Sequence, residues 1–226
     1  MYVIPAEAGI QKKLMRILVF SDTHLTDQFE PKKFAFLKKI ISDADFVIIN
    51  GDFWDGQLTS FEKFISSPWK KLFPLLKAKK AVYLFGNHDR QSYSDKNVNL
   101  FSNLQANAYR MKINGKKFIF EHGNRILPMF DEALPRSICK YTTIIAGFFL
   151  EKISPLKFIL KRTGQTMKNK VKKEANKNEV FVCGHSHFAD FDLKNQYINT
   201  GFIENGVAGY LIIDGGKIIP KFDRYS

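Results

Sequence analysis

The sequence predicts an α/β fold in which two β-sheets pack face to face, and three observations lead to that prediction. Short apolar runs alternate with segments of helical periodicity through the first half of the chain. Short β-type segments follow one another later in the chain, with Gly or Asn at the turns between them. The order βαβαβ followed by many strands favours a two-sheet sandwich over a single parallel sheet. A chain of 226 residues with 45% hydrophobic content is long enough to bury such a core.

The apolar runs of the first half are expected to be buried strands of a covered sheet. They are residues 16–20, 46–50 and 81–85. Between the first two, apolar residues recur at helical spacing after Pro31, which suits the first turn of a helix. Between the second and third, apolar residues from Phe61 to Leu76 predict a helix that is interrupted at Pro68 and Pro74.

The later part of the chain is expected to supply most of the second sheet. Its β-type segments are residues 117–122, 179–184, 196–201, 209–214 and 217–222. Residues 124–178 interrupt this series and contain 12 Lys or Arg against four Asp or Glu, which is +8 of the formal charge of +13. We interpret this segment as a mostly helical cap inserted into one domain, residues 15–226. Residues 1–14 are interpreted as an N-terminal extension outside the fold.

Bulk composition limits the class of partner. A formal charge of +13 favours phosphorylated substrates, nucleic acid or an anionic membrane surface, although a lysine-rich surface also serves solubility alone. Cys139 and Cys183 are too few for a disulfide framework, which fits a reducing cytosol. The chain opens with no secretory pattern, and its longest apolar stretch, residues 142–150, is far shorter than the ~20 residues that span a bilayer. We therefore expect a cytoplasmic protein without a transmembrane helix.

All five histidines follow directly after predicted strands, beside Gly, Asp or Asn. The motifs are Asp22-Thr23-His24, Gly51-Asp52, Gly86-Asn87-His88-Asp89, His122-Gly123 and Gly184-His185-Ser186-His187. Strand ends of α/β folds meet in a crevice outside the sheet, and residues two apart in extended chain face the same way. Imidazole and carboxylate donors suit Mn²⁺, Fe²⁺, Zn²⁺ or Ni²⁺. A single histidine is more often a hydrogen-bonded structural residue, but all five in this pattern predict a metal centre.

These five motifs, in this order, resemble those of the calcineurin-like metallophosphoesterases, and the resemblance extends from about Arg16 to Gly201. It implies a four-layer α/β/β/α sandwich with two divalent ions at the sheet edge, Mn²⁺ first among the four metals above. The first ion would be held by Asp22, His24, Asp52 and His187. Asp52 would bridge to the second ion, which Asn87, His122 and His185 would also hold. In this family's chemistry a metal-bridged hydroxide attacks the phosphorus.

The resemblance also assigns residues outside the metal ligands. His88 is expected to be catalytic, either donating to the leaving oxygen or stabilising the transition state, with Asp89 orienting its ring. Asn199, in "INTG", is expected to support the ligands from outside. Asn124 and Arg125, which directly follow the H-G motif, are expected to contact the substrate.

Within the family, the layout resembles the UDP-2,3-diacylglucosamine hydrolases, which cleave a lipid-linked diphosphate at the membrane surface. The shared features are a compact core, a helical insertion between the H-G and G-H-x-H motifs, and "YINTG". Two positions depart from that branch, which usually has arginine at position 88 and an acidic residue at position 124. The expected substrate is thus a phosphodiester or diphosphate, on a lipid-linked or nucleotide-sugar molecule, with an anionic membrane as a peripheral contact.

Other functions stay open from the sequence. A nuclease or cyclic-nucleotide phosphodiesterase would use the same centre, but nucleic acid is the less favoured partner because few aromatic residues lie among the lysines. A non-catalytic scaffold, as in the retromer subunit with this fold, is disfavoured by the intact histidine set. The cap is expected to meet lipid through apolar side chains, or alternatively to pack them on the core. They are Ile144, Ile145, Phe148, Phe149, Phe158 and Leu160.

Overall fold

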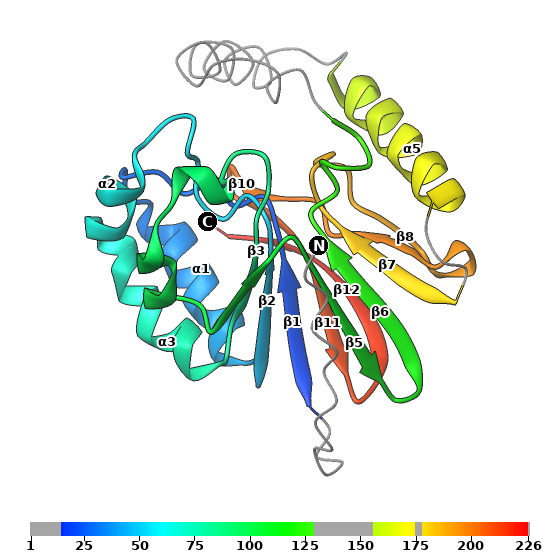
Figure 1. Ribbon diagram of the computed structural model, residues 1–226, viewed down its shortest axis with the longest axis horizontal. Helices are drawn as coiled ribbons and strands as arrows, with labels where there is room; N and C mark the ends of the chain where they lie inside the picture. The colour runs from blue at the N-terminus through cyan, green and yellow to red at the C-terminus, as the bar shows by residue number, and fades with distance from the viewer. Residues whose placement is uncertain (1–14, 129–155, 175–177, 226) are drawn as a thin grey trace.

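The computed structural model describes residues 15–128, 156–174 and 178–225, and two β-sheets form its centre (Figure 1). The first sheet has seven strands in the order β10-β11-β1-β2-β3-β4, with β12 beside β11. Its strands are β1 (Arg16–Phe20), β2 (Phe46–Asn50), β3 (Val82–Leu84), β4 (Leu104–Ala106), β10 (Ile203–Glu204), β11 (Val207–Asp214) and β12 (Lys217–Arg224). Strands β1 to β4 are parallel, and β11 pairs with β1 in the antiparallel direction.

The second sheet has five strands in the order β5-β6-β7-β9-β8. Its strands are β5 (Ala108–Ile113), β6 (Lys116–Glu121), β7 (Glu179–Cys183), β8 (Asp190–Asp192) and β9 (Tyr197–Asn199). The three central strands β6, β7 and β9 are parallel, whereas β5 and β8 are antiparallel edges. The sequence prediction did not include β4, β5, β8 or β10.

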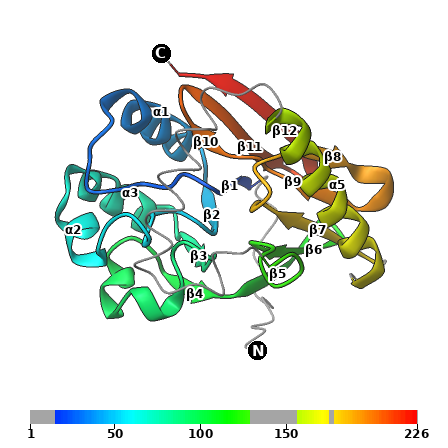
Figure 2. The ribbon, with the colours of Figure 1, turned by 90° about the horizontal axis from the view of Figure 1, so that it is seen from above.

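Helices cover the outer face of each sheet, so the described chain has the predicted α/β/β/α layers (Figure 2). On the first sheet lie α1 (Pro31–Ser42), α2 (Phe61–Ser66), η1 (Pro68–Leu72) and α3 (Phe73–Ala78); α5 (Leu156–Glu174) lies on the second. Short 3₁₀ helices are η2 (Gln91–Tyr93), η3 (Lys96–Leu100) and η5 (Leu193–Asn195). The predicted interruption is present at Pro68, but Pro74 lies in the first turn of α3 and so begins a helix instead of breaking one.

The core has three apolar layers, and β1 shows how the sequence separates them. Successive side chains of a strand point to opposite faces. Leu18 and Phe20 therefore pack with the helices on the first sheet, while Ile17 and Val19 pack between the two sheets. All four side chains are fully buried, which explains why this strand is apolar throughout.

The third layer lies between the second sheet and α5. Met167 and Val171 of the helix are buried against sheet residues that include Phe181. At the edge of the sheet, Lys168 Nζ lies 3.0 Å from an Asp190 carboxylate oxygen and 2.6 Å from one of Asp192. The helix belongs to the segment that the sequence predicts to be a cap.

Much of what was predicted for the cap and the amino terminus lies outside the described residues. This applies to the extension at 1–14 and to Ile144, Ile145, Phe148 and Phe149 of the insertion. The domain boundaries therefore stay predictions. No helix in the described ranges combines the length and apolarity that crossing a bilayer requires.

Candidate metal centre

Five loops at the carboxyl ends of parallel strands bring the candidate ligands together. The first sheet contributes the loops after β1, β2 and β3, and the second sheet contributes those after β6 and β7. Because strands in a parallel arrangement end at the same edge, the two sheets present their loops to a common crevice. This edge of the sandwich holds all seven candidate ligands. They are Asp22, His24, Asp52, Asn87, His122, His185 and His187.

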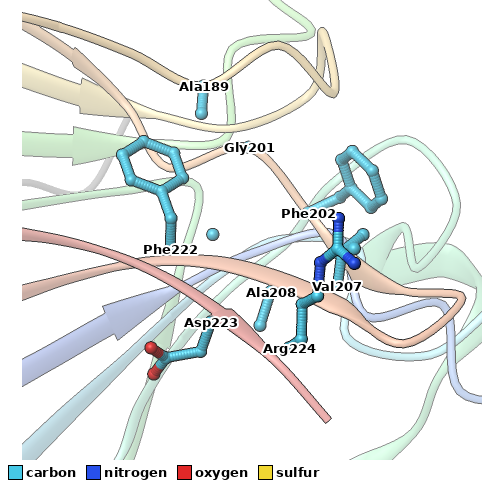
Figure 3. A pocket seen from close by; sticks show the side chains of 9 residues that line it. Ala189, Gly201, Phe202, Val207, Ala208, Phe222, Asp223 and Arg224 are labelled. Atoms are coloured by element: carbon cyan, nitrogen blue, oxygen red, sulfur yellow. The ribbon is translucent and has the colours of Figure 1, made fainter. Parts of the chain in front are cut away.

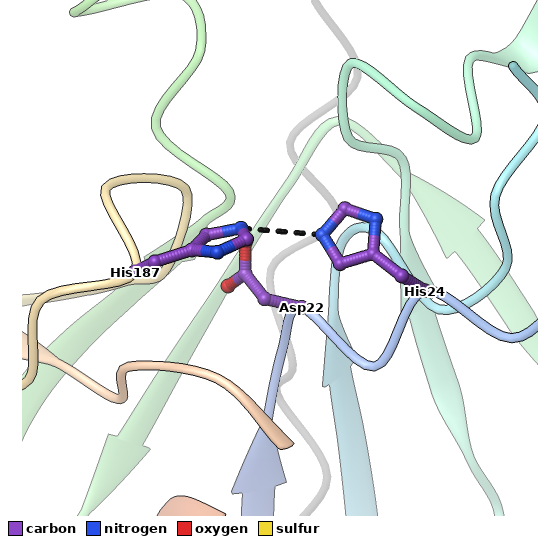
Figure 4. A group of neighbouring side chains, drawn as sticks. All are labelled: Asp22, His24 and His187. Carbon is purple, nitrogen blue, oxygen red and sulfur yellow. Dashed lines mark hydrogen bonds and ion pairs between the residues drawn. The ribbon is translucent and has the colours of Figure 1, made fainter. Parts of the chain in front are cut away.

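One cluster joins the loops after β1 and β7 (Figure 4). His187 Nε2 lies 3.2 Å from Asp22 Oδ1 and 3.2 Å from His24 Nε2. The potential donor atoms of these three residues all lie within 4.8 Å of one another. Three donors converging on a small volume is the arrangement that a cation requires.

A second cluster contains Asp52, His122 and His185, whose potential donor atoms also lie within 4.8 Å of one another. His122 Nε2 is 3.1 Å from Asp52 Oδ2, and the same oxygen is 3.9 Å from His24 Nε2. Asn87 Oδ1 lies 3.1 Å from His122 Nε2 and 2.8 Å from His185 Nδ1. Asp52 therefore stands between the two clusters, as a shared ligand would.

The hydrogen bonds of two histidines show that this donor set fits a metal ion. His122 Nδ1 lies 2.9 Å from the carbonyl oxygen of Asn50, and His185 Nε2 lies 2.8 Å from that of Leu127. A carbonyl only accepts, so each of these ring nitrogens donates its hydrogen to it. In the neutral ring the other nitrogen then carries a lone pair, and it faces Asn87. Carbonyl partners orient metal-binding histidines in the same way.

The backbone at the site is strained. Five of the candidate ligands have φ angles between +43° and +68°: Asp22, His24, Asp52, His185 and His187. Such angles cost a non-glycine residue of order 1–3 kcal/mol each and cluster at functional sites. Hydrogen bonds hold the conformation; for example, the Asp22 and His24 amides donate to the carbonyls of Gly51 and Asp52. The fold thus maintains a costly geometry at the positions where ligands are predicted.

Three glycines in the motifs allow the loops to approach one another. A Cβ atom at Gly51 would lie 2.3 Å from His122 Nδ1, and one at Gly184 would lie 2.2 Å from Asp22 Oδ2. At Gly86 it would lie 2.2 Å from Asp52 Oδ1. Each of these glycines precedes one candidate ligand and lies against another. A larger residue at any of the three positions would clash with a ligand, so the close packing of the loops requires glycine there.

The partner of His88 differs from the prediction. Its Nδ1 atom lies 3.2 Å from Asp55 Oδ2, and His24 Nδ1 lies 3.4 Å from the same oxygen. Asp89, which was predicted to orient His88, accepts hydrogen bonds from the backbone amides of Asp52, Phe53 and Gly86. Its carboxylate is therefore occupied in joining the loops after β2 and β3. The prediction for Asp89 is corrected: it positions backbone, and Asp55 orients the ring.

Sequence reasoning missed Asp55. This buried carboxylate follows Asp52 by three residues and precedes Gly56, in a turn that begins at a motif already identified. That proximity was the available signal. Burial alone would raise the pKa of Asp55, but hydrogen bonds from His24 and His88 outweigh it and hold the pKa below its usual range.

Residues 15–197 match the family model described as calcineurin-like phosphoesterase. The chain belongs to this family. With the His and Asp clusters, membership supports a metal-dependent phosphoesterase that binds divalent metal ions. No curated protein matches the chain.

Three solved structures illustrate the likeness to known proteins. The E. coli phosphoesterase Yfce is 17% identical with a TM-score of 0.48, and the match covers 94% of this chain and 100% of that one. A dimetal phosphatase from Danio rerio is 12% identical with a TM-score of 0.47, covering 94% and 99%. Entamoeba histolytica Vps29 complexed with Zn²⁺ is 12% identical with a TM-score of 0.47, covering 94% and 100%. The assignment to the family depends on the family match and not on these structures.

Asn199 lies outside the candidate ligands of this calcineurin-like phosphoesterase and holds one of their loops. Its Nδ2 atom donates to the Gly184 carbonyl at 2.6 Å and to Ser186 Oγ at 3.0 Å, and its Oδ1 accepts from the Gly201 amide. This is the supporting position that the sequence predicts for it.

The two predicted substrate residues lie after β6. Arg125 forms a two-pronged ion pair with Glu121, at 2.8 and 3.2 Å, while more than half of its side chain stays exposed. Asn124 is partly buried. Contact of either residue with substrate stays a prediction.

The electrostatics of the site favour a bound cation. Burial alone would raise the pKa of Asp52, but His122 and His88 outweigh it and hold the pKa well below its usual range. Burial disfavours the protonated form of His122, yet the carboxylates of Asp52 and Asp22 outweigh burial and raise its pKa to about 10. Burial and the adjacent His122 lower the pKa of His185 to about 4. The carboxylates that attract a proton to His122 would equally attract a divalent cation in its place.

Proposed function

We propose that the protein hydrolyses a phosphodiester or diphosphate bond with two divalent cations in this centre. Asp22, His24, Asp52 and His187 would hold one, and Asp52, Asn87, His122 and His185 the other. Bound there, the cations would lower the pKa of water and offset the negative charge of the phosphoryl oxygens. The observation that carries the proposal is the position of Asp52 Oδ2 between His122 and His24.

The chain's own residues prepare Asp52 for this role. Its Oδ1 atom accepts a hydrogen bond of 2.9 Å from the backbone amide of His88, which fixes the carboxylate plane. Oδ2 then faces the two histidines. The Asp89 carboxylate holds the Asp52 amide from behind, so the bridging residue is fixed at both backbone and side chain.

His88 is suited to donate a proton to the leaving oxygen. Burial lowers its pKa, but the Asp52 and Asp55 carboxylates outweigh burial and the net shift is upward. Its Nδ1 is directed at Asp55, so Nε2 is the nitrogen left for the substrate. Positioned acid–base groups of this kind contribute about 10²–10⁴-fold to the rate.

Manganese is the metal we propose first, with Fe²⁺, Zn²⁺ and Ni²⁺ as the other candidates. All seven candidate donors are imidazole nitrogen or carboxylate and amide oxygen, the ligands that suit these ions. Cys183 is fully buried, and burial raises the pKa of its thiol far above its usual value, which keeps it protonated. Cys183 also packs in the apolar layer between the second sheet and α5 and belongs to none of the candidate ligand groups among the described residues, so we leave it out of the donor set.

The bridge is tested by comparing Asp52→Asn with Asp43→Asn, an exposed carboxylate just beyond α1. Each variant is reconstituted with Mn²⁺, desalted, and analysed for metal by mass spectrometry and for hydrolysis of bis(p-nitrophenyl) phosphate. Two ions per chain are expected in the wild type and in Asp43→Asn. Asp52→Asn should fall below one ion and lose at least about 100-fold in rate. Full activity in Asp52→Asn, or in chelated wild type, contradicts the proposal, and metal-free, inactive wild type favours a scaffold.

We assign the substrate to the phosphorylated lipids or nucleotide sugars, as the likeness to UDP-2,3-diacylglucosamine hydrolases implies. The support is in α5, which carries seven Lys or Arg against one Glu along Leu156–Glu174. Near its start, Phe158 and Ile159 are 69% and 54% exposed. Apolar side chains beside basic ones suit an anionic lipid surface, where each basic residue contributes roughly 1 kcal/mol. A nuclease or cyclic-nucleotide phosphodiesterase stays the alternative.

Vesicle sedimentation tests the lipid contact. The double variant Phe158→Ser/Ile159→Ser is compared with Leu193→Ser, which removes a similarly exposed apolar side chain on η5. Wild type and Leu193→Ser should sediment with vesicles that contain roughly 30% phosphatidylserine, an amount chosen to give a substantial negative surface potential. Salt should release both proteins from the vesicles. The double variant should bind more weakly with an unchanged circular dichroism spectrum. Equal binding to neutral and anionic vesicles contradicts the lipid contact and leaves the hydrolytic proposal intact.

A further inference from the structure

A cavity of about 270 Å³ lies between the edges of the two sheets (Figure 3), and one of its lining residues, Phe202, contacts His187 of the candidate metal centre. Ala189 and Gly201 line it from the second sheet, next to β8 and β9. Val207 of β11 and Phe222 of β12 line it from the first sheet. Phe202 lies in the segment of chain that connects β9 of the second sheet to β10 of the first sheet. The walls are therefore mainly apolar.

The floor of this cavity is formed by backbone at two glycines, where there is no room for a side chain. A Cβ atom at Gly209 would lie 2.3 Å from the carbonyl oxygen of Thr200. One at Gly201, where φ is +79°, would lie 3.0 Å from the Cβ of Ala189. The two sheets thus approach closely at this point, and the aromatic rings above the floor determine what the cavity can bind.

Phe202 is a wall shared by the cavity and the metal centre. Its ring stacks on His187, with centroids 5.6 Å apart and planes at 26°. The Phe202 carbonyl accepts a hydrogen bond from the Gly209 amide, and the next amide, that of Ile203, donates to the carbonyl of Asp22. The cavity is therefore fixed relative to two candidate ligands. A group attached to a phosphoryl at His187 would therefore meet the Phe202 ring, which also lines the cavity.

The charges around the cavity suit a neutral or electron-rich guest. The Asp223 carboxylate accepts a hydrogen bond from the hydroxyl of Tyr210, a residue that packs in the helix-side core of the first sheet. This hydrogen bond holds the Asp223 carboxylate away from the interior of the cavity. Arg224, which is exposed, contributes a positive charge to the lining. Arginine and phenylalanine both stack on flat rings.

We infer that this cavity is a subsite for a planar ring carried by the phosphoester, either an aryl group or a nucleobase. The inference rests on the proposed function and names the class of substituent that it accepts. An apolar cavity of about 150 Å³ is already enough for benzene. Sites for drug-sized ligands begin near 300 Å³, so about 270 Å³ fits one substituted ring. The exposed ring of Phe222 and the shared ring of Phe202 supply the stacking surfaces.

Binding of small phosphonates to the Mn²⁺-loaded protein tests this subsite by calorimetry, without catalysis. Phenylphosphonate should bind about tenfold more tightly than methylphosphonate, because the ring leaves water for an apolar site. Cyclohexylphosphonate should bind less tightly than the phenyl compound because it is not flat. Uridine 5′-monophosphate against ribose 5-phosphate distinguishes the nucleobase from the aryl group: a preference for the uridine compound identifies a nucleobase site.

Variants locate the ring. Phe222→Ala removes a wall that is 63% exposed and so should leave folding unchanged, and Val207→Trp fills the cavity. Both variants should reduce the preference for phenylphosphonate over methylphosphonate to roughly twofold or less, because the phenyl ring would lose most of the area that it buries in the cavity. Lys221→Ala, the neighbouring residue on the opposite face of β12, is the matched control and should keep it.

The outcomes separate this inference from the proposed function. Equal affinity for the two phosphonates, no binding of either, or a phenyl preference that survives Phe222→Ala would overturn the subsite. Hydrolysis of bis(p-nitrophenyl) phosphate is measured separately. Hydrolysis without a phenyl preference refutes the subsite alone, whereas a phenyl preference without hydrolysis retains the subsite and refutes the hydrolase.

Discussion

Gly86 lies directly against Asp52, whose carboxylate is proposed to bridge two metal ions, and replacing Gly86 by alanine would create a clash with that residue. A Cβ atom there would lie 2.2 Å from Asp52 Oδ1 and 2.7 Å from the Asp52 amide nitrogen. Ordinary contact begins at 3.4 Å, so in this dense interior the carboxylate or its loop has to move by about 1 Å. The φ angle of Gly86 is not positive, so alanine adds no backbone strain and the clash is the whole perturbation.

Two consequences of Gly86→Ala have calculable size. Overpacking of this kind costs about 1–3 kcal/mol, which lowers Tm by roughly 2–12 °C in a domain of this size. A displacement of about 1 Å at a catalytic group costs about 100-fold in rate. The assays are thermal melting by circular dichroism, metal content after Mn²⁺ reconstitution, and hydrolysis of bis(p-nitrophenyl) phosphate well below Tm.

Gly115→Ala is the control for Gly86→Ala. Gly115 has a φ of +81° and no atom within 4 Å of the added Cβ, so its replacement tests backbone strain without a clash. It should lose about 1–2 kcal/mol of stability and keep both metal and rate. Wild-type metal content and rate in Gly86→Ala would refute the reasoning, because they would mean that the bridge position tolerates a shift of about 1 Å.

Three further predictions concern other parts of the molecule. His88→Asn should keep its metal content and lose about 10²–10⁴-fold in kcat; loss of one ion per chain would instead make His88 a ligand. Met167→Ala should lower the free energy of urea unfolding by about 2–5 kcal/mol, because Met167 is fully buried where α5 meets the second sheet. A change below roughly 0.5 kcal/mol, the size expected for a surface substitution, would show that α5 is not anchored there. Lys168 holds the pKa of Asp192 at about 2, below its usual 3.8, so the ion pair stabilises the protein above pH 3.8 and that stability is lost as pH falls toward 2. The Tm deficit of Asp192→Asn should therefore be largest above about pH 5, at most about 4 °C, and shrink below pH 4; a deficit that grows on acidification contradicts the assignment.

The sequence predicts the strands that contain apolar runs and misses strands with weaker patterns. Residues 16–20 and 46–50 are continuous apolar runs because each face of β1 and β2 meets a core layer. In β5, Tyr109, Met111 and Ile113 alternate with polar residues, the pattern of an edge strand covered on one side. β4, β8 and β10 are only two or three residues long and, unlike β3, do not lie in an apolar run that would identify them.

At the site, the sequence predicts residues that follow a strand directly and fails for contacts between loops. All seven candidate ligands lie at strand ends, where a local motif identifies them. Asp55, in the loop after β2, meets His24 and His88 of the loops after β1 and β3. Asp89, in the loop after β3, accepts hydrogen bonds from backbone amides of the loop after β2. The spacing from Asp52 indicates that Asp55 is near the site, but it does not identify the partners of Asp55 or Asp89, because tertiary packing creates both contacts.

The assembly of the centre from both sheets has a consequence for the order of folding events. His24 and His187 lie 163 residues apart and belong to loops of different sheets. Contacts of such long sequence separation are expected to form late, because closing so long a loop costs conformational entropy that local contacts do not cost. A cation that needs both loops can bind tightly only after the sheets have docked, and it then stabilises the docked state alone. We therefore expect the uptake of Mn²⁺ during refolding to lag behind the appearance of secondary structure, with a delay that times the docking of one sheet on the other.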